Sequence, residues 1–195
     1  MSLKNSYVTA DRMEWDTATN LVRKLYRDGN YRMSLLIGCG IFFGLRISDL
    51  KQLTWSMLLD GEKFVIFEQK TGKRREVTIN KQFQKHIKDC FKALNIEDKG
   101  EHCFISRKKR IFSTQRINVL FKEIREKYGL KVEHLSTHTM RKTFGYRVYS
   151  TSGDNAEVAL VKLMELFNHS SVSITKRYLG IRQEELAECY SMLSF

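Results

Sequence analysis

The residues between His138 and Gly180 include two histidines, an arginine and a tyrosine whose types and spacing suit phosphoryl-transfer chemistry. His138 and Arg141 are three positions apart, so both side chains share one face if the segment is helical. His169 and Tyr178 follow near the end of the stretch. A guanidinium can hold two phosphate oxygens, and imidazoles can donate hydrogen bonds or move protons. The stretch therefore predicts a site that transfers a phosphoryl group to a tyrosine hydroxyl.

Each of these residues also has an ordinary structural interpretation. His138 suits a hydrogen-bonded core imidazole, His169 a turn, and Tyr178 a core aromatic with its hydroxyl at the surface. Upstream, Arg46 lies among apolar residues with Asp49 one helical turn later, which is typical of a structural ion pair. Single residues do not decide between these interpretations, so the order of the whole set becomes the informative feature.

The elements expected to position these residues are mainly helices. The first helix is expected to begin near Thr9 to Asp11, ahead of apolar residues at helical spacing. Residues 31–43 are apolar on nearly every side, which predicts a central buried helix, and Gly44 suits the left-handed residue that closes it. Further helices are expected to begin near Asn80, Ser113, Thr137 and Asp154, and a short one after Ser171.

Residues 57–79 have the periodicity of β-strands. Two β-branched and aromatic runs, 64–67 and 77–79, flank the turn-like Thr71-Gly72. This pattern predicts a small antiparallel sheet with Lys70 and Lys73 at its hairpin, and residues 104–105 are expected to add a short extended piece. The expected fold class is therefore α+β and mostly helical.

The formal net charge of +12 at pH 7 points to a polyanionic partner. With 195 residues, 42% of them hydrophobic, the chain is long enough for one packed domain. An anionic membrane surface is the competing partner, but no apolar run is long enough to span a bilayer and no signal peptide is evident. The cysteines are far apart and lack metal-ligand spacing, so reduced thiols in a cytoplasmic protein are expected. They are Cys39, Cys90, Cys103 and Cys189.

Taken in chain order, the candidate residues resemble the catalytic domain of the tyrosine recombinases, also called the phage integrase family. The resemblance runs through the motifs GLRISDL, LTWS, QKTGK, HTMR and LFNHSS to a tyrosine before a glycine, and it covers the chain from about Thr9 to Gly180. Six ordered functional positions are far more specific than any one short motif. The six matching catalytic residues are Arg46, Lys70, His138, Arg141, His169 and Tyr178, and Asp49 matches the family's supporting acid.

The resemblance implies a site-specific DNA recombinase, an integrase of a mobile element, that breaks and rejoins strands without a metal or cofactor. It implies the family's catalytic-domain fold, with a small three-stranded antiparallel sheet. Arg46, Arg141 and His169 are expected to stabilise the scissile phosphate. Tyr178 is expected to attack it and form a 3′-phosphotyrosine, while Lys70 protonates the leaving 5′-oxygen.

The resemblance gives His138 the role of accepting the tyrosine proton, and Asp49 the role of orienting its neighbours. One departure is Asn168, where the family commonly has glycine, but asparagine tolerates positive φ and the turn should survive. A second departure is that the chain has no room for the DNA-clamping domain that usually precedes the catalytic one. Residues 1–195 are therefore expected to form a single catalytic domain, as a fragment of a longer protein.

Two other functions fit parts of the same pattern. A type IB topoisomerase nicks and reseals one strand with a very similar set of residues, and joining of a strand to a different duplex would distinguish a recombinase from it. A DNA-binding module whose catalysis has decayed is the second alternative, and a covalent adduct assay would exclude it.

Duplex DNA is the expected partner, bound on the face that holds the catalytic residues. In the longer protein, a homotetramer on DNA is expected, and residues 181–195 form a tail helix that packs on a neighbouring protomer or on its own domain. Because residues 170–180 contain small polar side chains, Tyr178 is expected to lie away from Arg141 when DNA is absent. The additional DNA contacts are expected from Lys73, Arg107, Lys108, Lys109 and Arg110.

Overall fold

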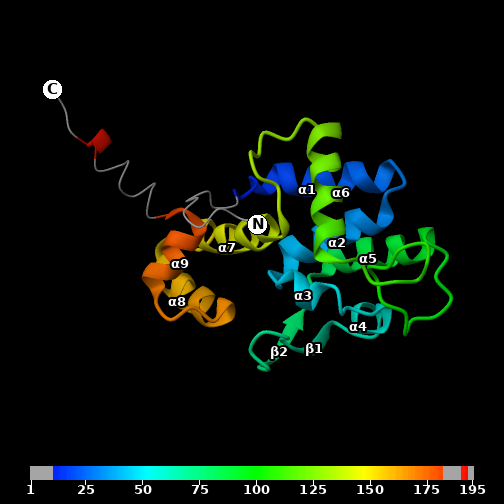
Figure 1. Ribbon diagram of the computed structural model, residues 1–195. Helices are drawn as coiled ribbons and strands as arrows, with labels where there is room; N and C mark the ends of the chain where they lie inside the picture. The colour runs from blue at the N-terminus through cyan, green and yellow to red at the C-terminus, as the bar shows by residue number, and fades with distance from the viewer. Residues whose placement is uncertain (1–10, 182–189, 193–195) are drawn as a thin grey trace.

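The structure, a computed structural model, describes residues 11–181 and 190–192 (Figure 1). Within these residues the chain is mostly helical, with one small sheet, which confirms the expected fold class. The helices are α1 (Trp15–Arg27), α2 (Tyr31–Phe43), α3 (Ile47–Leu50), α4 (Trp55–Leu59), α5 (Lys81–Ala93), α6 (Thr114–Lys127), α7 (Thr137–Ser150), α8 (Ala156–Phe167) and α9 (Val172–Leu179).

The sheet consists of strands β1 (Lys63–Phe67) and β2 (Arg74–Thr78), paired antiparallel so that Phe64 lies opposite Val77. The prediction of three strands is wrong for the part of the chain that the structure describes. Ile105 forms an isolated bridge with Ile111, because the chain reverses between them, and the N–H of Ser106 donates to the carbonyl of Arg110. The extended piece at residues 104–105 therefore pairs locally.

The first helix begins at Trp15, later than expected from the sequence. The segment before it runs along α7, where the N–H of Met13 donates to Oγ1 of Thr143 at 2.9 Å. The Thr143 hydroxyl donates in turn to the carbonyl of Met13 at 3.3 Å. These two bonds satisfy the polar backbone of Met13 without a helical turn, so α1 starts only after it.

Helix α7 lies between α1, α2 and α6 on one side and α8 and α9 on the other (Figure 1), and it contacts two hydrophobic cores. The larger core contains the buried side chains of α1, α2, α4, α5 and α6, and it includes Met140 of α7. The smaller core contains those of α8 and α9 together with Ile181, and Phe144 of α7 packs against it. Because α7 contacts both cores, the two polar residues near its beginning, His138 and Arg141, lie at the boundary between them.

Helix α2 is the central helix that the sequence predicts, and Gly44 ends it with a φ of 57°. The thiols of Cys39, Cys90 and Cys103 are free and buried, and Cys189 lies outside the described residues. The expected tail helix at residues 181–195 also lies largely outside them. No helix in the described part of the chain combines the length and the apolar character needed to cross a membrane.

Candidate active site

The six residues that the sequence singles out as catalytic line one pocket of about 350 Å³. The pocket lies between the start of α3, the β1–β2 hairpin, the start of α7 and helix α9. Residues far apart in the sequence therefore come together in the fold. The lining residues are Arg46, Ile47, Ser48, Lys70, Thr137, His138, Arg141, Phe167, Asn168, His169 and Tyr178.

Arg141 is buried at the floor of the site, with 5% of its surface exposed. Its Nη1 donates to the carbonyl of Gly44 at 2.5 Å, and its guanidinium lies 4.2 Å from the centre of the Phe167 ring. Burial lowers the pKa of Arg141 to about 10, with a smaller effect from the positive charge of Arg46. The side chain remains a cation at neutral pH and is held in place from two sides.

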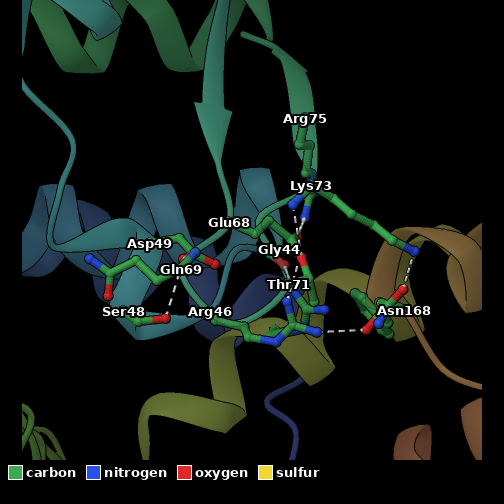
Figure 2. Close-up of polar contacts among 12 residues, drawn as sticks. Gly44, Arg46, Ser48, Asp49, Glu68, Gln69, Thr71, Lys73, Arg75 and Asn168 are labelled. Carbon is green, nitrogen blue, oxygen red and sulfur yellow. Dashed lines mark hydrogen bonds and ion pairs between the residues drawn. The ribbon is translucent and has the colours of Figure 1, made fainter.

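Arg46 is held by a carboxylate that the sequence did not single out. Its Nη1 donates to Oε2 of Glu68 at 2.7 Å, and its Nη2 donates to the carbonyl of Phe167 at 2.8 Å. The ion-pair partner of Arg46 is therefore Glu68, and the expected pairing with Asp49 is wrong. The cause is the hairpin, which folds back so that the residue after β1 reaches the beginning of α3 (Figure 2).

Glu68 is a buried carboxylate, 4% exposed, that connects several parts of the site. It also accepts a hydrogen bond from Oγ1 of Thr71 at 2.9 Å and lies 3.6 Å from Nη1 of Arg75. Burial raises its pKa, but the bond from Thr71 and the charge of Arg46 outweigh this and leave the pKa below its usual value.

A period-two signal in the sequence could have identified Glu68. Phe64 and Ile66 of β1 are buried, and Glu68 is the next residue on the same face of the strand. An acid at an inward-facing position requires a cationic or hydrogen-bonding partner. The alternation predicts the strand from its apolar residues, and Glu68 lies one residue beyond that apolar run.

Asp49 supports the hairpin that carries Lys70. Its Oδ1 accepts from the backbone N–H of Gln69 at 2.9 Å and from the hydroxyl of Ser48 at 3.3 Å. This places Asp49 next to the backbone that leads into Lys70. Lys70 lines the pocket, and Nζ of Lys73 donates to Oδ1 of Asn168, another lining residue, at 2.5 Å (Figure 2).

Helix α7 begins with a capping box that fixes the position of His138. The hydroxyl of Ser136 accepts from the N–H of His138 at 3.3 Å, and the Thr139 hydroxyl accepts from the N–H of Ser136 at 3.0 Å. Desolvation lowers the pKa of His138, and the charges of Arg141 and Lys142 lower it further. The imidazole is therefore neutral at pH 7 and able to accept a proton.

Tyr178 lies inside the pocket, so the expectation that it lies away from Arg141 without DNA is wrong. Its ring packs edge-on against Phe167 at 5.6 Å and against His169 at 5.2 Å. The hydroxyl oxygen is buried and has no hydrogen-bond partner among the residues that the structure describes. Burial raises the pKa of Tyr178, while the charges of Arg141 and Arg46 oppose this rise.

His169 is positioned by the first turn of α9. Ser171 caps this helix, and its hydroxyl accepts from the N–H of Ile174 at 3.3 Å. The buried Thr175 lies one turn later, with Oγ1 3.1 Å from Nδ1 of His169. Burial lowers the pKa of His169, and Arg141 and Arg46 add to that effect. The two pocket histidines therefore share a preference for the neutral form.

The basic run 107–110, expected to contact DNA, does not line this pocket. It forms the reversal between Ile105 and Ile111, and Arg107 borders a second pocket beside α2 and α6. Across the described residues, no three His, Cys, Asp or Glu side chains form a group suited to a metal ion.

Comparisons with known proteins agree with this geometry. A profile of the phage integrase family matches residues 14–185. The chain is 32% identical over 173 residues to the probable integrase/recombinase YoeC of Bacillus subtilis (strain 168), covering 88% of this chain and 90% of that protein. It is 26% identical over 157 residues to the tyrosine recombinase XerD of Rhizobium meliloti (strain 1021), covering 80% of this chain and 49% of that protein.

Solved structures with the same fold have lower sequence identity. The XerA recombinase superposes with a TM-score of 0.72 at 21% identity, covering 96% of this chain and 66% of that one. The XerH site-specific recombinase bound to palindromic difH substrate superposes with a TM-score of 0.68 at 19% identity, covering 94% and 53%. The chain thus spans most of YoeC but about half of XerD and XerH.

Proposed function

Because this chain belongs to the phage integrase family of tyrosine recombinases, enzymes that cleave and rejoin DNA, we propose that its pocket performs site-specific strand exchange through a covalent bond between DNA and Tyr178. One observation carries the proposal. Two arginines, a lysine, two histidines and a buried phenol with an unpartnered hydroxyl line the same pocket. Ser48 and Thr137 also bring hydroxyls to the pocket, and membership of the family favours Tyr178 over them as the nucleophile.

The cations stabilise the charge that gathers on the phosphate in the transition state. Arg46 and Arg141 bind the non-bridging oxygens, and each is already fixed by a carbonyl or carboxylate, so little reorganisation is needed. His169 donates a further hydrogen bond to the same oxygens. This preorganisation is the contribution that the fold makes to catalysis.

The chemical step exchanges one phosphodiester bond for another. The oxygen of Tyr178 forms a bond to the scissile phosphorus, and the bond from phosphorus to the 5′-oxygen breaks. His138 accepts the phenolic proton, and Lys70 donates a proton to the departing 5′-oxygen. Religation to a different strand reverses these steps, and the phosphotyrosine conserves the bond energy in between.

Duplex DNA is the proposed substrate, with a homotetramer as the proposed assembly of the full-length protein in the cytoplasm and no membrane partner. The net charge of +12 supports a polyanionic partner. The substrate of XerH is described as palindromic, and two equivalent half-sites suit a symmetric protein assembly.

The test uses a nicked duplex from which the cleaved fragment diffuses away, so that the covalent adduct accumulates. Tyr178→Phe should bind DNA as the wild type does and yield no adduct on a denaturing gel, because one hydroxyl is removed. Tyr149→Phe is the matched control and should form normal adduct. An adduct of normal yield from Tyr178→Phe would refute the mechanism. A separate assay, in which the wild type joins the cleaved strand to a second duplex, distinguishes recombination from topoisomerase activity.

A further inference from the structure

The loop of the β1–β2 hairpin contacts the turn after α8 through two side chains. Nζ of Lys73 donates to Oδ1 of Asn168 at 2.5 Å, although the residues are 95 positions apart in the chain (Figure 2). Lys73 directly precedes β2, three residues after Lys70. Asn168 directly precedes His169. The contact therefore joins the segment that carries the proposed general acid to the segment that carries Tyr178.

Asn168 adopts a left-handed conformation, with a φ of 55° and a ψ of 49°. Glycine adopts this conformation more readily than asparagine, because it has no Cβ. Glycine would also close α8 with the same backbone bonds. What asparagine adds is an amide oxygen, and the structure places that oxygen on Lys73.

A second contact fixes the other end of the hairpin loop, residues 68–73. Glu68 binds Arg46, and Arg46 donates to the carbonyl of Phe167, the residue before Asn168. The loop is thus attached to the α8–α9 turn at its beginning through Arg46 and at its end through Lys73. Lys70 lies between the two attached ends and lines the pocket.

We propose that Lys73 and Asn168 are a positioning pair that holds Lys70 where it can protonate the leaving 5′-oxygen. The inference rests on the proposed function of the pocket. Within the loop, Asp49 holds the N–H of Gln69 and Glu68 holds the hydroxyl of Thr71, while the side chain of Lys70 is exposed. These bonds fix the shape of the loop, and the contact with Asn168 fixes the loop against the segment that carries His169.

The informative variant is Asn168→Gly, which removes the acceptor and keeps the backbone conformation. It changes no charge, so duplex affinity and its salt dependence should stay at the wild-type values. Single-turnover adduct formation should fall by about three- to tenfold, the range for loss of one ordinary hydrogen bond. The midpoint temperature of thermal unfolding should be unchanged or slightly raised, and this result would exclude misfolding as the cause of the slower reaction.

A substrate with sulfur in place of the bridging 5′-oxygen identifies the step that is affected, because a thiolate leaves without protonation. On this substrate Asn168→Gly should react at the wild-type rate, as Lys70→Ala should. Lys73→Met should behave like Asn168→Gly in the rate of cleavage, and the double variant should be no slower than either single variant.

Three results would overturn the inference: an unchanged rate for Asn168→Gly, a slow rate that sulfur does not restore, or additive losses in the double variant. Additive losses would mean that Lys73 acts directly on DNA. The wild type and Lys70→Ala report on the proposed function separately, since adduct formation by the wild type and its loss in Lys70→Ala do not depend on Asn168.

Discussion

Tyr178 enters the proposed reaction as a neutral phenol, because burial raises its pKa above the usual value of 10. Its proton must therefore leave as the oxygen attacks. His138 and His169 both have lowered pKa values, chiefly because they are desolvated, so both are unprotonated at neutral pH. The site thus places a phenol that holds its proton beside a neutral His138 that can accept it, and this combination has a measurable pH signature.

We predict that the second-order rate constant for adduct formation stays level from pH 8 to below pH 6.5. This constant is measured at concentrations too low to saturate the protein with DNA, so its pH dependence reports on the free protein. A lowered histidine pKa keeps the accepting form populated at pH values where an ordinary imidazole is half protonated. The measurement is a pH series with the nicked substrate. His134→Gln, at an exposed histidine outside the pocket, should leave the profile unchanged. An acid limb centred at or above pH 6.5 would contradict the prediction.

Glu68 should contribute to stability as well as to the position of Arg46. Glu68→Ala leaves Arg46 and Arg75 without their carboxylate, and we expect a loss of about 3 kcal/mol in the free energy of unfolding. Because the folded pKa of Glu68 is depressed, this contribution is present above the unfolded pKa and is lost as pH falls through the folded one.

Urea unfolding at pH 7 and at acid pH measures the effect of Glu68→Ala. Glu76→Ala is the control, since Glu76 pairs with Lys63 on the exposed face of the same sheet, and its effect should be much smaller. Equal losses for the two variants would show that burial does not strengthen the Glu68 network. The difference in the free energy of unfolding between Glu68→Ala and Glu76→Ala should become smaller at acid pH.

At the level of elements, α2 and α7 meet at Gly44, which ends α2 and accepts the hydrogen bond from Arg141. A Cβ at Gly44 would overlap the ring of Phe144, and its φ of 57° disfavours any other residue. Gly129 has nearly the same φ, 59°, with nothing within 4 Å of a Cβ. The two glycines therefore separate backbone strain from steric overlap.

We predict that Gly129→Ala lowers the free energy of unfolding by about 1–2 kcal/mol, the cost of a left-handed alanine. Gly44→Ala should cost about 1–3 kcal/mol more, because the core must also accommodate the overlap with Phe144. Denaturant unfolding of both variants checks this difference, and adduct formation should fall in Gly44→Ala alone. Equal destabilisation would mean that Phe144 moves aside freely.

The sequence predicts elements well where the signal is local. The apolar run of α2 and the cap at Ser171 depend on neighbouring residues, and both match the structure. The predicted start of α1 is wrong because it depends on a distant partner, Thr143, which satisfies the backbone before α1. The predicted third strand is wrong because the chain reverses at 107–110, so that Ile105 pairs locally with Ile111 and not with the sheet.

The same distinction separates the predicted from the missed residues of the site. The six pocket residues lie in short motifs that carry their own local setting, so their order in the chain was enough to single them out. The partner of Arg46, Glu68, depends on how the hairpin folds back, whereas spacing along the chain pointed only to Asp49. The contact between Lys73 and Asn168 spans 95 positions and has no local signature.

At the scale of the whole molecule, the net charge of +12 predicts binding to a polyanion. The pocket contains Arg46, Lys70 and Arg141, whereas the run 107–110 lies outside it, between the bridged residues Ile105 and Ile111. If both regions contact one duplex, the footprint on DNA must extend well beyond the scissile phosphate. Salt dependence measures how many phosphates are neutralised, so it can test each region separately.

We predict that duplex binding weakens steeply with salt and that the run 107–110 accounts for part of the slope. Replacing Lys108, Lys109 and Arg110 with glutamine should lower the slope of log K against log salt by about 0.9 for each phosphate that the loop no longer neutralises. Replacing Lys81, Lys85 and Lys88, which are exposed on α5, removes the same charge from another surface. If the loop binds phosphates directly, the loop variant changes the slope more than the α5 variant. Equal changes in slope would mean that the net charge of the protein, and not the position of the loop, governs binding. Long-range electrostatic attraction depends on the total charge, whereas a direct phosphate contact depends on where the charged side chain lies.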